Sequence, residues 1–148
     1  MSRIFKFDND VDTDQIIASQ YLLLPNIDEM KSHAFESLDA DFASGVKDGD
    51  IIVAGDNFGC GSSREQAPEI IKHLNIRCVI AKSFARIFFR NSINNGLLLI
   101  ENKDIPDAVR EGDELTVIMN DKITFNGKDY PIEPLPDNLM EILNAGGL

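Results

Sequence analysis

The sequence IIVAGDNFGCGSSRE, residues 51–65, decides the fold class of this chain. Its first four residues are apolar and predict a buried strand, and the glycine-rich remainder predicts a loop. A helix is predicted next, at residues 68–74 with Pro68 in its first turn, and then a second buried strand at residues 78–81. A strand, a loop, a helix and a strand in this order predict a parallel βαβ unit with a right-handed crossover.

On both sides of this unit the sequence predicts further strands and helices. Residues 3–7 alternate apolar and polar side chains and predict a short edge strand, followed by an acidic turn. Asn126 and Gly127 predict a tight turn between two strands. The other predicted strands are residues 97–100, 114–119 and 122–125, and the other predicted helices are residues 28–38, 84–94 and 139–143. We therefore expect a mixed α/β domain with the parallel unit at its centre and antiparallel strands towards both ends.

The composition excludes several classes of protein. The chain has 148 residues, 25 of them acidic and 14 basic, so its formal net charge is −11. This length and an apolar content of 43% suit one folded domain over residues 1–148 and argue against intrinsic disorder. Such an acidic chain repels phosphate backbones, so we expect no nucleic-acid partner. No apolar stretch has the length of a signal or a membrane span, so we expect a cytoplasmic protein without membrane contact.

Cysteine and histidine are too few and too scattered to predict a metal site. Cys60 and Cys78 are the two cysteines of the sequence and form no Cys-x-x-Cys pair. Together with His33 and His73 they match no zinc or iron–sulfur spacing. We expect no metal ligand in this chain, so a function that needs a metal requires another component to hold it.

The loop at residues 59–65 carries the sharpest chemical signal. Its glycines let the backbone approach a ligand, its hydroxyls and backbone N–H groups suit an anion, and Arg64 can bind a carboxylate through two hydrogen bonds. This predicts an anionic ligand. A purely structural interpretation carries about equal weight, because Ser62 and Glu65 also fit a capping box at a helix start. Against it, a helix capped at Ser62 would place Pro68 well inside.

Other motifs are weak. Neither a serine-hydrolase elbow, a Walker A loop nor a dinucleotide fingerprint fits residues 55–65. Lys82, Arg86 and Arg90 have the spacing of one helix face, where they form either a solvated cationic stripe or part of an anion site. The carboxylates of the acidic turn do not follow a calcium-loop pattern.

Six segments in order resemble the isopropylmalate isomerase (3-isopropylmalate dehydratase) small-subunit family. They are DTDQII (12–17), YL (21–22), GDIIV (49–53), NFGCGSSRE (57–65), SFARI (83–87) and RNSINNGL (90–97). The resemblance implies a swivelling β/β/α domain, as in the C-terminal domain of aconitase. It also implies a heterodimer with a large subunit that holds a [4Fe–4S] cluster, without which this chain is inactive. Gln20 and Gln66 stand where this family commonly has arginine and histidine.

The resemblance also implies roles for individual residues. Ser62 is expected to act as the catalytic base, with Ser63 and Arg64 at the substrate. Asp14 matches the family's active-site aspartate, and Thr13 accompanies it. Leu23 and Leu24 occupy the segment that varies with substrate, where an apolar pair suits a branched alkyl group better than a third carboxylate.

The expected function is the isomerisation of 2-isopropylmalate to 3-isopropylmalate in leucine biosynthesis, by dehydration and rehydration. One alternative is a related hydro-lyase acting on 2,3-dimethylmalate, citramalate or citraconate, or homoaconitate. Another alternative is a non-catalytic module that binds a small dicarboxylate. Loss of turnover in Ser62→Ala would separate the enzyme from the binding module.

Overall fold

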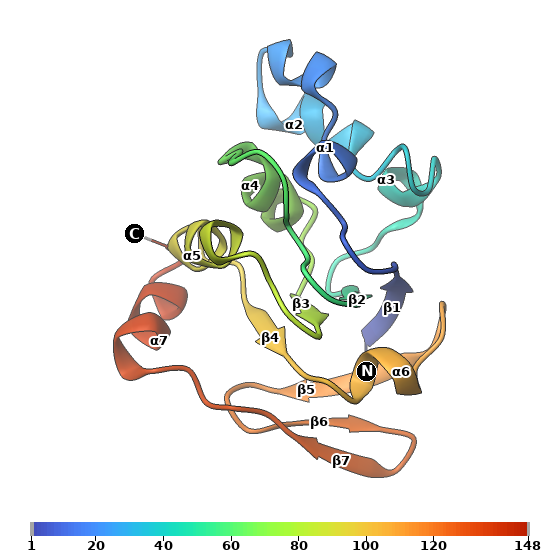
Figure 1. The fold of residues 1–148 in the computed structure, drawn as a ribbon, viewed down its shortest axis with the longest axis vertical. Helices are drawn as coiled ribbons and strands as arrows, with labels where there is room; N and C mark the ends of the chain where they lie inside the picture. Colours follow the sequence, from blue (N-terminus) through green and yellow to red (C-terminus); the bar gives the residue numbers. More distant parts are fainter. Residues whose placement is uncertain (1, 148) are drawn as a thin grey trace.

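Seven strands form one sheet in the computed structural model, which describes residues 2–147 (Figure 1). Their order across the sheet is β4-β3-β2-β1-β5-β6-β7. The strands are β1 (Ser2–Lys6), β2 (Ile51–Ala54), β3 (Cys78–Ala81), β4 (Leu99–Glu101), β5 (Glu114–Ile118), β6 (Lys122–Phe125) and β7 (Lys128–Pro131).

The sheet has a parallel half and an antiparallel half that meet at β1. Strands β1 to β4 are parallel, with Ile51 opposite both Ile4 and Cys78, so the predicted βαβ unit is confirmed. The prediction of β1 as an edge strand is wrong, because β1 also pairs antiparallel with β5. Antiparallel strands were also predicted towards both ends of the chain, and within residues 2–147 the antiparallel pairs involve β1 near its start and β5, β6 and β7 further along. Strand β5 lies more than 100 residues after β1 in the sequence, so the local alternation of residues in β1 cannot predict this pairing.

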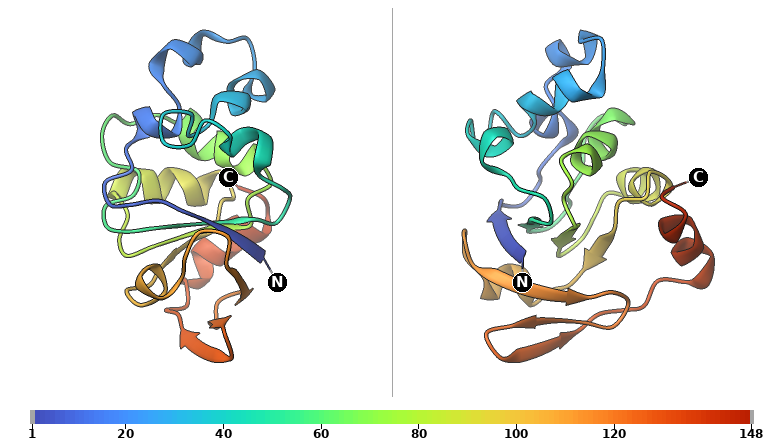
Figure 2. Two further views of the ribbon diagram at one scale, coloured as in Figure 1. Left: turned by 90° about the vertical axis from the view of Figure 1, so that its right-hand side faces the viewer. Right: turned by 180° about the vertical axis from the view of Figure 1, so that it is seen from behind.

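Seven α-helices and two 3₁₀ turns are found within residues 2–147. They are α1 (Thr13–Ile16), η1 (Ser19–Leu23), α2 (Ile27–Met30), η2 (Lys31–His33), α3 (Phe42–Gly45), α4 (Gln66–His73), α5 (Arg86–Asn94), α6 (Ile105–Ala108) and α7 (Asp137–Asn144). Helices α1 to α4 lie together on one side of the parallel strands, and α6 lies on the other side with β5 to β7 (Figures 1 and 2). None of these helices is long and apolar enough to cross a bilayer.

Alternate residues of the parallel strands feed two separate cores. Ile52 and Ala54 of β2 pack with α1 to α4, whereas Ile51 and Val53 pack with α6, α7 and the antiparallel strands. This alternation follows from the period of two in a strand and explains why the parallel strands are apolar throughout. Helix α5 contributes to both cores, through Phe88 on one side and Ile93 on the other.

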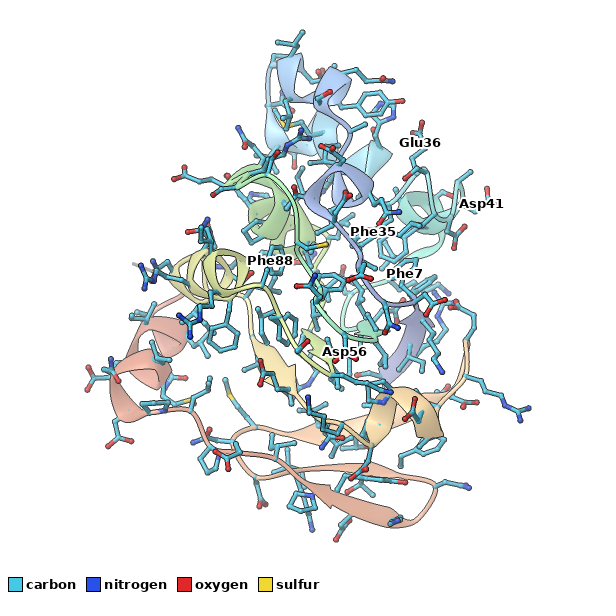
Figure 3. The ribbon with its side chains drawn as sticks, in the orientation of Figure 1. Phe7, Phe35, Glu36, Asp41, Asp56 and Phe88 are labelled. Atoms are coloured by element: carbon cyan, nitrogen blue, oxygen red, sulfur yellow. The ribbon has the colours of Figure 1, made fainter. Side chains whose placement is uncertain are left out.

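The single helix predicted at residues 28–38 is wrong. Helix α2 ends at Met30, and after the short η2 turn Phe35 has a left-handed φ of 57°. This conformation turns the Phe35 side chain into the core, where its ring stacks on that of Phe7 with centroids 4.9 Å apart (Figure 3). Phe42 packs against both rings. The packing of these three rings explains why the helix is interrupted before Phe35, although the apolar residues of the segment have helical spacing.

Candidate active site

Three loops meet at the carboxyl ends of β1, β2 and β3, where ligand sites of parallel sheets lie. They are residues 7–12, 55–65 and 82–85, and backbone hydrogen bonds join them. The N–H of Asp10 donates to the carbonyl of Asp56 at 2.8 Å, and the N–H of Lys82 donates to the carbonyl of Gly55 at 3.1 Å. Phe58 N–H donates to Ser83 at 3.1 Å. The shape of the site is therefore set largely by main-chain contacts.

Glycine is needed at two positions of the middle loop. Gly59 has φ +84°, and a Cβ there would lie 2.1 Å from Cγ of Phe88. Gly61 has φ +90° and lies close to Asp12. L-residues with side chains rarely adopt such φ values, so these glycines allow the loop to pass closely between the α1 and α5 segments.

The capping box of this region lies at Asp12, not at Ser62. The Asp12 carboxylate accepts from the N–H of Gln15 at 3.0 Å, and the Gln15 side chain accepts from the N–H of Asp12 at 3.1 Å. Helix α4 begins at Gln66 without a side-chain cap, two residues before its predicted start, and Pro68 lies in its first turn. The structural interpretation of Ser62 is therefore wrong, and this serine is left for another role.

Thr13 and Asp14 connect α1 to the glycine-rich loop. The Thr13 hydroxyl donates to the backbone carbonyl of Ser62 at 2.6 Å, and the Thr13 N–H donates to the carbonyl of Cys60 at 2.9 Å. The Asp14 carboxylate forms an ion pair with Nη2 of Arg64. Nη1 of Arg64 donates to the carbonyl of Ile17 at 3.0 Å. Four of the predicted site residues, Thr13, Asp14, Ser62 and Arg64, are thus brought together.

A cavity of about 240 Å³ opens beside this cluster. Ser62 and Ser63 are exposed in its lining, and the first turn of α5 also lines it. Its lining residues are Thr13, Gly59, Gly61, Ser62, Ser63, Arg64, Ala85, Arg86, Ile87, Phe88 and Asn91. Two exposed hydroxyls, a guanidinium and the start of a helix around one cavity are suited to a small anion.

Leu23 and Leu24 are not among the residues that line this cavity. Leu23 is 90% exposed at the end of η1, and Leu24 packs partly against the first core. The structure of this chain alone therefore does not bring the two leucines to Ser62.

A second cavity, of about 270 Å³, lies beside Asp14 and contains a polar cluster that the sequence analysis missed. The rings of Tyr21 and His33 stack with centroids 3.8 Å apart. Glu36 accepts from the Tyr21 hydroxyl at 2.7 Å, and its other oxygen lies 2.7 Å from Nδ1 of His33. The hydrogen bond with His33, and then that with Tyr21, lowers the pKa of Glu36, and the bond with Glu36 raises the pKa of Tyr21.

The predicted cationic stripe is wrong in one of its three members. Lys82 precedes α5 and forms an ion pair with Asp107 at 2.8 Å, which raises the pKa of Lys82. Phe84 lies between Lys82 and the helix and pairs with Phe58 across the loops, so α5 cannot start before Ala85. Arg86 and Arg90 are the members that lie on the helix.

The cysteines are placed apart. Cys78 is fully buried in β3, and burial raises the pKa of its thiol to about 12. Cys60 lies in the glycine-rich loop, where burial and then the charges of Asp12 and Asp10 raise its pKa. Residues 2–147 contain no group of three or more histidine, cysteine, aspartate or glutamate side chains that could hold a metal ion.

Comparisons with known proteins place this chain among named relatives. The family model "Aconitase C-terminal domain" matches residues 7–105. A 3-isopropylmalate dehydratase small subunit from Lachnospira eligens is 64% identical over 146 residues, which cover 99% of this chain and 89% of the relative. An isopropylmalate/citramalate isomerase small subunit from Methanocaldococcus jannaschii is 51% identical over 149 residues, covering 99% and 89% of the two chains. The crystal structure of a 3-isopropylmalate dehydratase from Methanocaldococcus jannaschii superposes with a TM-score of 0.93 at 46% identity, again covering 99% of this chain and 89% of that one.

Proposed function

Because this chain belongs to the aconitase C-terminal domain family, as a small subunit of 3-isopropylmalate dehydratase, we propose that its glycine-rich loop performs the proton transfer of that hydro-lyase. The resemblance in the six sequence segments and the expected swivelling β/β/α fold are both confirmed by these relatives. The chain is thus a subunit of an enzyme of leucine biosynthesis.

The isomerisation needs a base and a group that activates a hydroxyl. Dehydration of 2-isopropylmalate removes a proton from the carbon next to one carboxylate and the hydroxyl from the adjacent carbon. Rehydration then adds the hydroxyl to the carbon that lost the proton and a proton to the carbon that lost the hydroxyl. Ser62 is the base in this proposal. The observation that carries it is the arrangement around Ser62, whose exposed hydroxyl shares a cavity with Arg64 and the first turn of α5.

A serine hydroxyl needs strong help to act as a base near neutral pH. Positive groups beside it stabilise the alkoxide, and exclusion of water strengthens their effect. Arg64 is held by Asp14 and by the carbonyl of Ile17, so it presents its charge without having to be ordered on binding. The bond from Thr13 to the Ser62 carbonyl holds the serine's backbone in place. Ser63 supplies a second hydroxyl for a substrate carboxylate.

The partner in this proposal is an iron–sulfur large subunit, since relatives of this chain are named small subunits. Neither cysteine of this chain lies in a ligand set, so the [4Fe–4S] cluster is assigned to that partner. When bound there, the cluster supplies a Lewis acid for the leaving hydroxyl. In this proposal the cavity that contains Ser62 faces the large subunit.

The substrate in this proposal is isopropylmalate, with Leu23 and Leu24 beside its alkyl group. Burial of a third carboxylate against leucine is costly, which disfavours homoaconitate. Leu23 is exposed and therefore free to meet a substrate in the assembled enzyme. Citramalate is the second candidate, because one relative is named an isopropylmalate/citramalate isomerase small subunit.

The test is a kinetic comparison of the complex with its large subunit on isopropylmalate, citramalate, 2,3-dimethylmalate and homoaconitate. Ser62→Ala should lower kcat roughly 10²- to 10⁴-fold, as expected for loss of a positioned base, with assembly intact. Ser44→Ala, on α3 away from the cavity, is the matched control and should leave kcat unchanged. Absence of isopropylmalate turnover in the wild-type complex contradicts the proposed substrate. Full activity of Ser62→Ala contradicts the role of the loop and favours a binding module.

A further inference from the structure

Arg86 is a cation at the catalytic cavity to which no role has yet been assigned. It is the first residue of α5, it is exposed, and it lines the same cavity as Ser62 and Ser63. None of the ion pairs among residues 2–147 involves Arg86. Its guanidinium is therefore available to an anion from outside the chain.

Arg64, in contrast, is already engaged. Its two terminal nitrogens bind the Asp14 carboxylate and the carbonyl of Ile17. Because Arg64 also pairs with Asp14, its single positive charge cannot balance a malate-type substrate, which brings two carboxylates. A chain with a net charge of −11 must offer positive charge at the site itself to bind such a dianion.

We propose that Arg86 binds one carboxylate of the dicarboxylate substrate, through two parallel hydrogen bonds from its guanidinium. The inference rests on the proposed function and adds to it a substrate-binding residue on α5. Arginine suits this task because its planar fork matches the geometry of a carboxylate. Ser62 and Arg86 then both contact the substrate within the same cavity.

The backbone holds Arg86 in a fixed relation to the glycine-rich loop. Ala85 N–H donates to the carbonyl of Phe58 at 3.0 Å, directly before Arg86. Within the first turn of α5, the Phe88 ring packs on Gly59, and it also contacts the ring of Phe58 with centroids 5.4 Å apart. The helix start that carries Arg86 is thus attached to the loop that carries Ser62.

The start of α5 adds a favourable field at the same place. Ala85 is the N-cap residue and has no side chain that could accept from the first N–H groups of the helix. These groups carry the positive end of the helix dipole and favour an anion. They support the binding of a carboxylate by Arg86, which remains the residue on which the inference depends.

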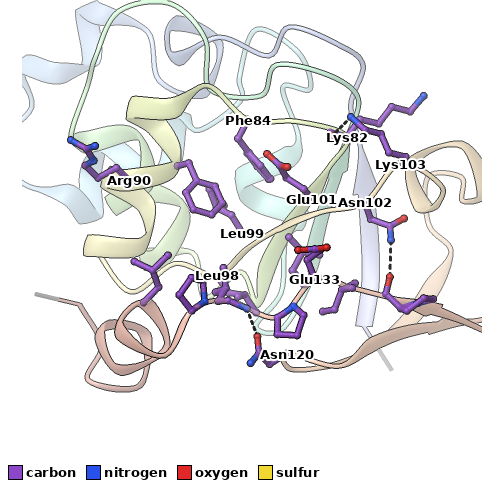
Figure 4. A pocket seen from close by; sticks show the side chains of 18 of the residues that line it. Lys82, Phe84, Arg90, Leu98, Leu99, Glu101, Asn102, Lys103, Asn120 and Glu133 are labelled. Carbon is purple, nitrogen blue, oxygen red and sulfur yellow. Dashed lines mark hydrogen bonds between the residues drawn. The ribbon is translucent and has the colours of Figure 1, made fainter.

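Arg90 provides a matched comparison on the same helix. It lies one turn after Arg86, is also exposed, and belongs to no ion pair within residues 2–147. However, Arg90 lines a different and larger cavity of about 920 Å³, together with Leu98 and Glu133 (Figure 4). Arg86 lines both cavities, whereas Arg90 is absent from the lining of the cavity that contains Ser62.

The experiment compares Arg86→Gln, Arg86→Lys and Arg90→Gln in the complex with the large subunit. Arg86→Gln should raise KM for isopropylmalate roughly 10- to 100-fold, as expected for loss of hydrogen bonds between charged groups. The KM of Arg86→Lys should lie between those of the wild type and Arg86→Gln, since lysine keeps the positive charge but lacks the planar guanidinium that forms two hydrogen bonds. Arg90→Gln should leave KM within about twofold of wild type, because it removes the same charge without touching the cavity.

A second measurement tests the contact itself. A competitive inhibitor with two carboxylates should lose affinity in Arg86→Gln, while its analogue with one carboxylate replaced by an amide should lose much less. Equal effects of Arg86→Gln and Arg90→Gln on KM would overturn the inference, as would an Arg86→Gln subunit that no longer assembles with its partner. A wild-type complex that does not turn over isopropylmalate would instead refute the proposed function, so the two failures are distinguishable.

Discussion

The hydroxyl of Thr13 lies 2.6 Å from the backbone carbonyl oxygen of Ser62, although 49 residues separate the two in the sequence. Thr13 is 2% exposed, so this hydrogen bond is formed largely out of water. It joins the first residue of α1 to the loop after β2, at the residue proposed as the base. The position of Ser62 therefore depends on a side chain from helix α1.

Thr13→Val should lower both stability and turnover. Valine has the shape of threonine but cannot donate, so the free energy of unfolding should fall by about 1 kcal/mol, as for loss of one hydrogen bond. The kcat of the complex should fall as well, because the Ser62 backbone loses its partner. Thr13→Ser keeps the hydroxyl and should retain most of the activity. Urea denaturation and steady-state kinetics measure the two effects, and a fully active Thr13→Val complex would contradict the expected role of the bond.

The Asp14–Arg64 pair should behave as one unit in kinetics. Asp14→Asn and Arg64→Lys should each lower kcat/KM roughly 10- to 100-fold. Asp14→Asn removes the carboxylate that holds the Arg64 guanidinium in place, and Arg64→Lys removes the planar guanidinium itself. The double variant should lose little more than either single one, since partners in one interaction are not additive.

The exposed Lys122–Asp129 pair of the β6–β7 hairpin serves as the control for breaking an ion pair. Lys122→Gln should leave kcat/KM unchanged. Additive losses in the Asp14→Asn, Arg64→Lys double variant would show that the two residues act independently.

Gly59→Ala should destabilise the fold more than Gly112→Ala. Both glycines have similar left-handed φ values, +84° and +87°, so alanine is strained at both, by about 1–2 kcal/mol. A Cβ at residue 59 also collides with Phe88, whereas nothing lies within 4 Å of one at residue 112. Overpacking should add about 1–3 kcal/mol to the loss at residue 59. Equal shifts of the free energy of unfolding in the two variants would refute the close contact between Gly59 and α5.

Glu36 should titrate below its ordinary pKa of 4.5. The bond with His33 is the larger cause, so His33→Ala should move the pKa of Glu36 further back towards 4.5 than Tyr21→Phe does. Carbon-13 NMR of the carboxyl group measures both shifts. Because folding lowers the pKa of Glu36, its ionised carboxylate stabilises the folded state above pH 4.5. This stabilisation is lost as the pH falls through the lower pKa that Glu36 has in the folded state. An unchanged Glu36 pKa in His33→Ala would contradict this assignment.

Local patterns predicted the elements whose neighbours are close in sequence. The strand at residues 122–125 and the turn at Asn126 and Gly127 were predicted correctly, and both residues of the turn have positive φ. The central place of β1 was missed because it depends on pairing with β2 and β5, which local alternation does not reveal. The break at Phe35 depends on rings from distant segments.

The candidate site shows the same division between local and distant information. The loop around Ser62 was found from its composition, but a capping box at Ser62 carried about equal weight, whereas the structure has the capping box at Asp12, where residues 12–15 form a similar short pattern. The contacts of Arg64 with the Asp14 carboxylate and the Ile17 carbonyl are seen only in the structure, because Arg64 is distant from both residues in the sequence. The sequence shows Arg86 as one of three regularly spaced cations, and only the structure, in which α5 starts at Arg86, separates it from Lys82.

The place of β1 has a consequence for the synthesis of the chain. During synthesis, β1 is made before both of its neighbours, which lie at residues 51–54 and 114–118. Until the second of these has emerged, one edge of β1 is unpaired, and such an edge invites association with other chains. A nascent subunit therefore cannot complete this sheet before residues 114–131 have been made, and its large number of distant pairings favours slow folding.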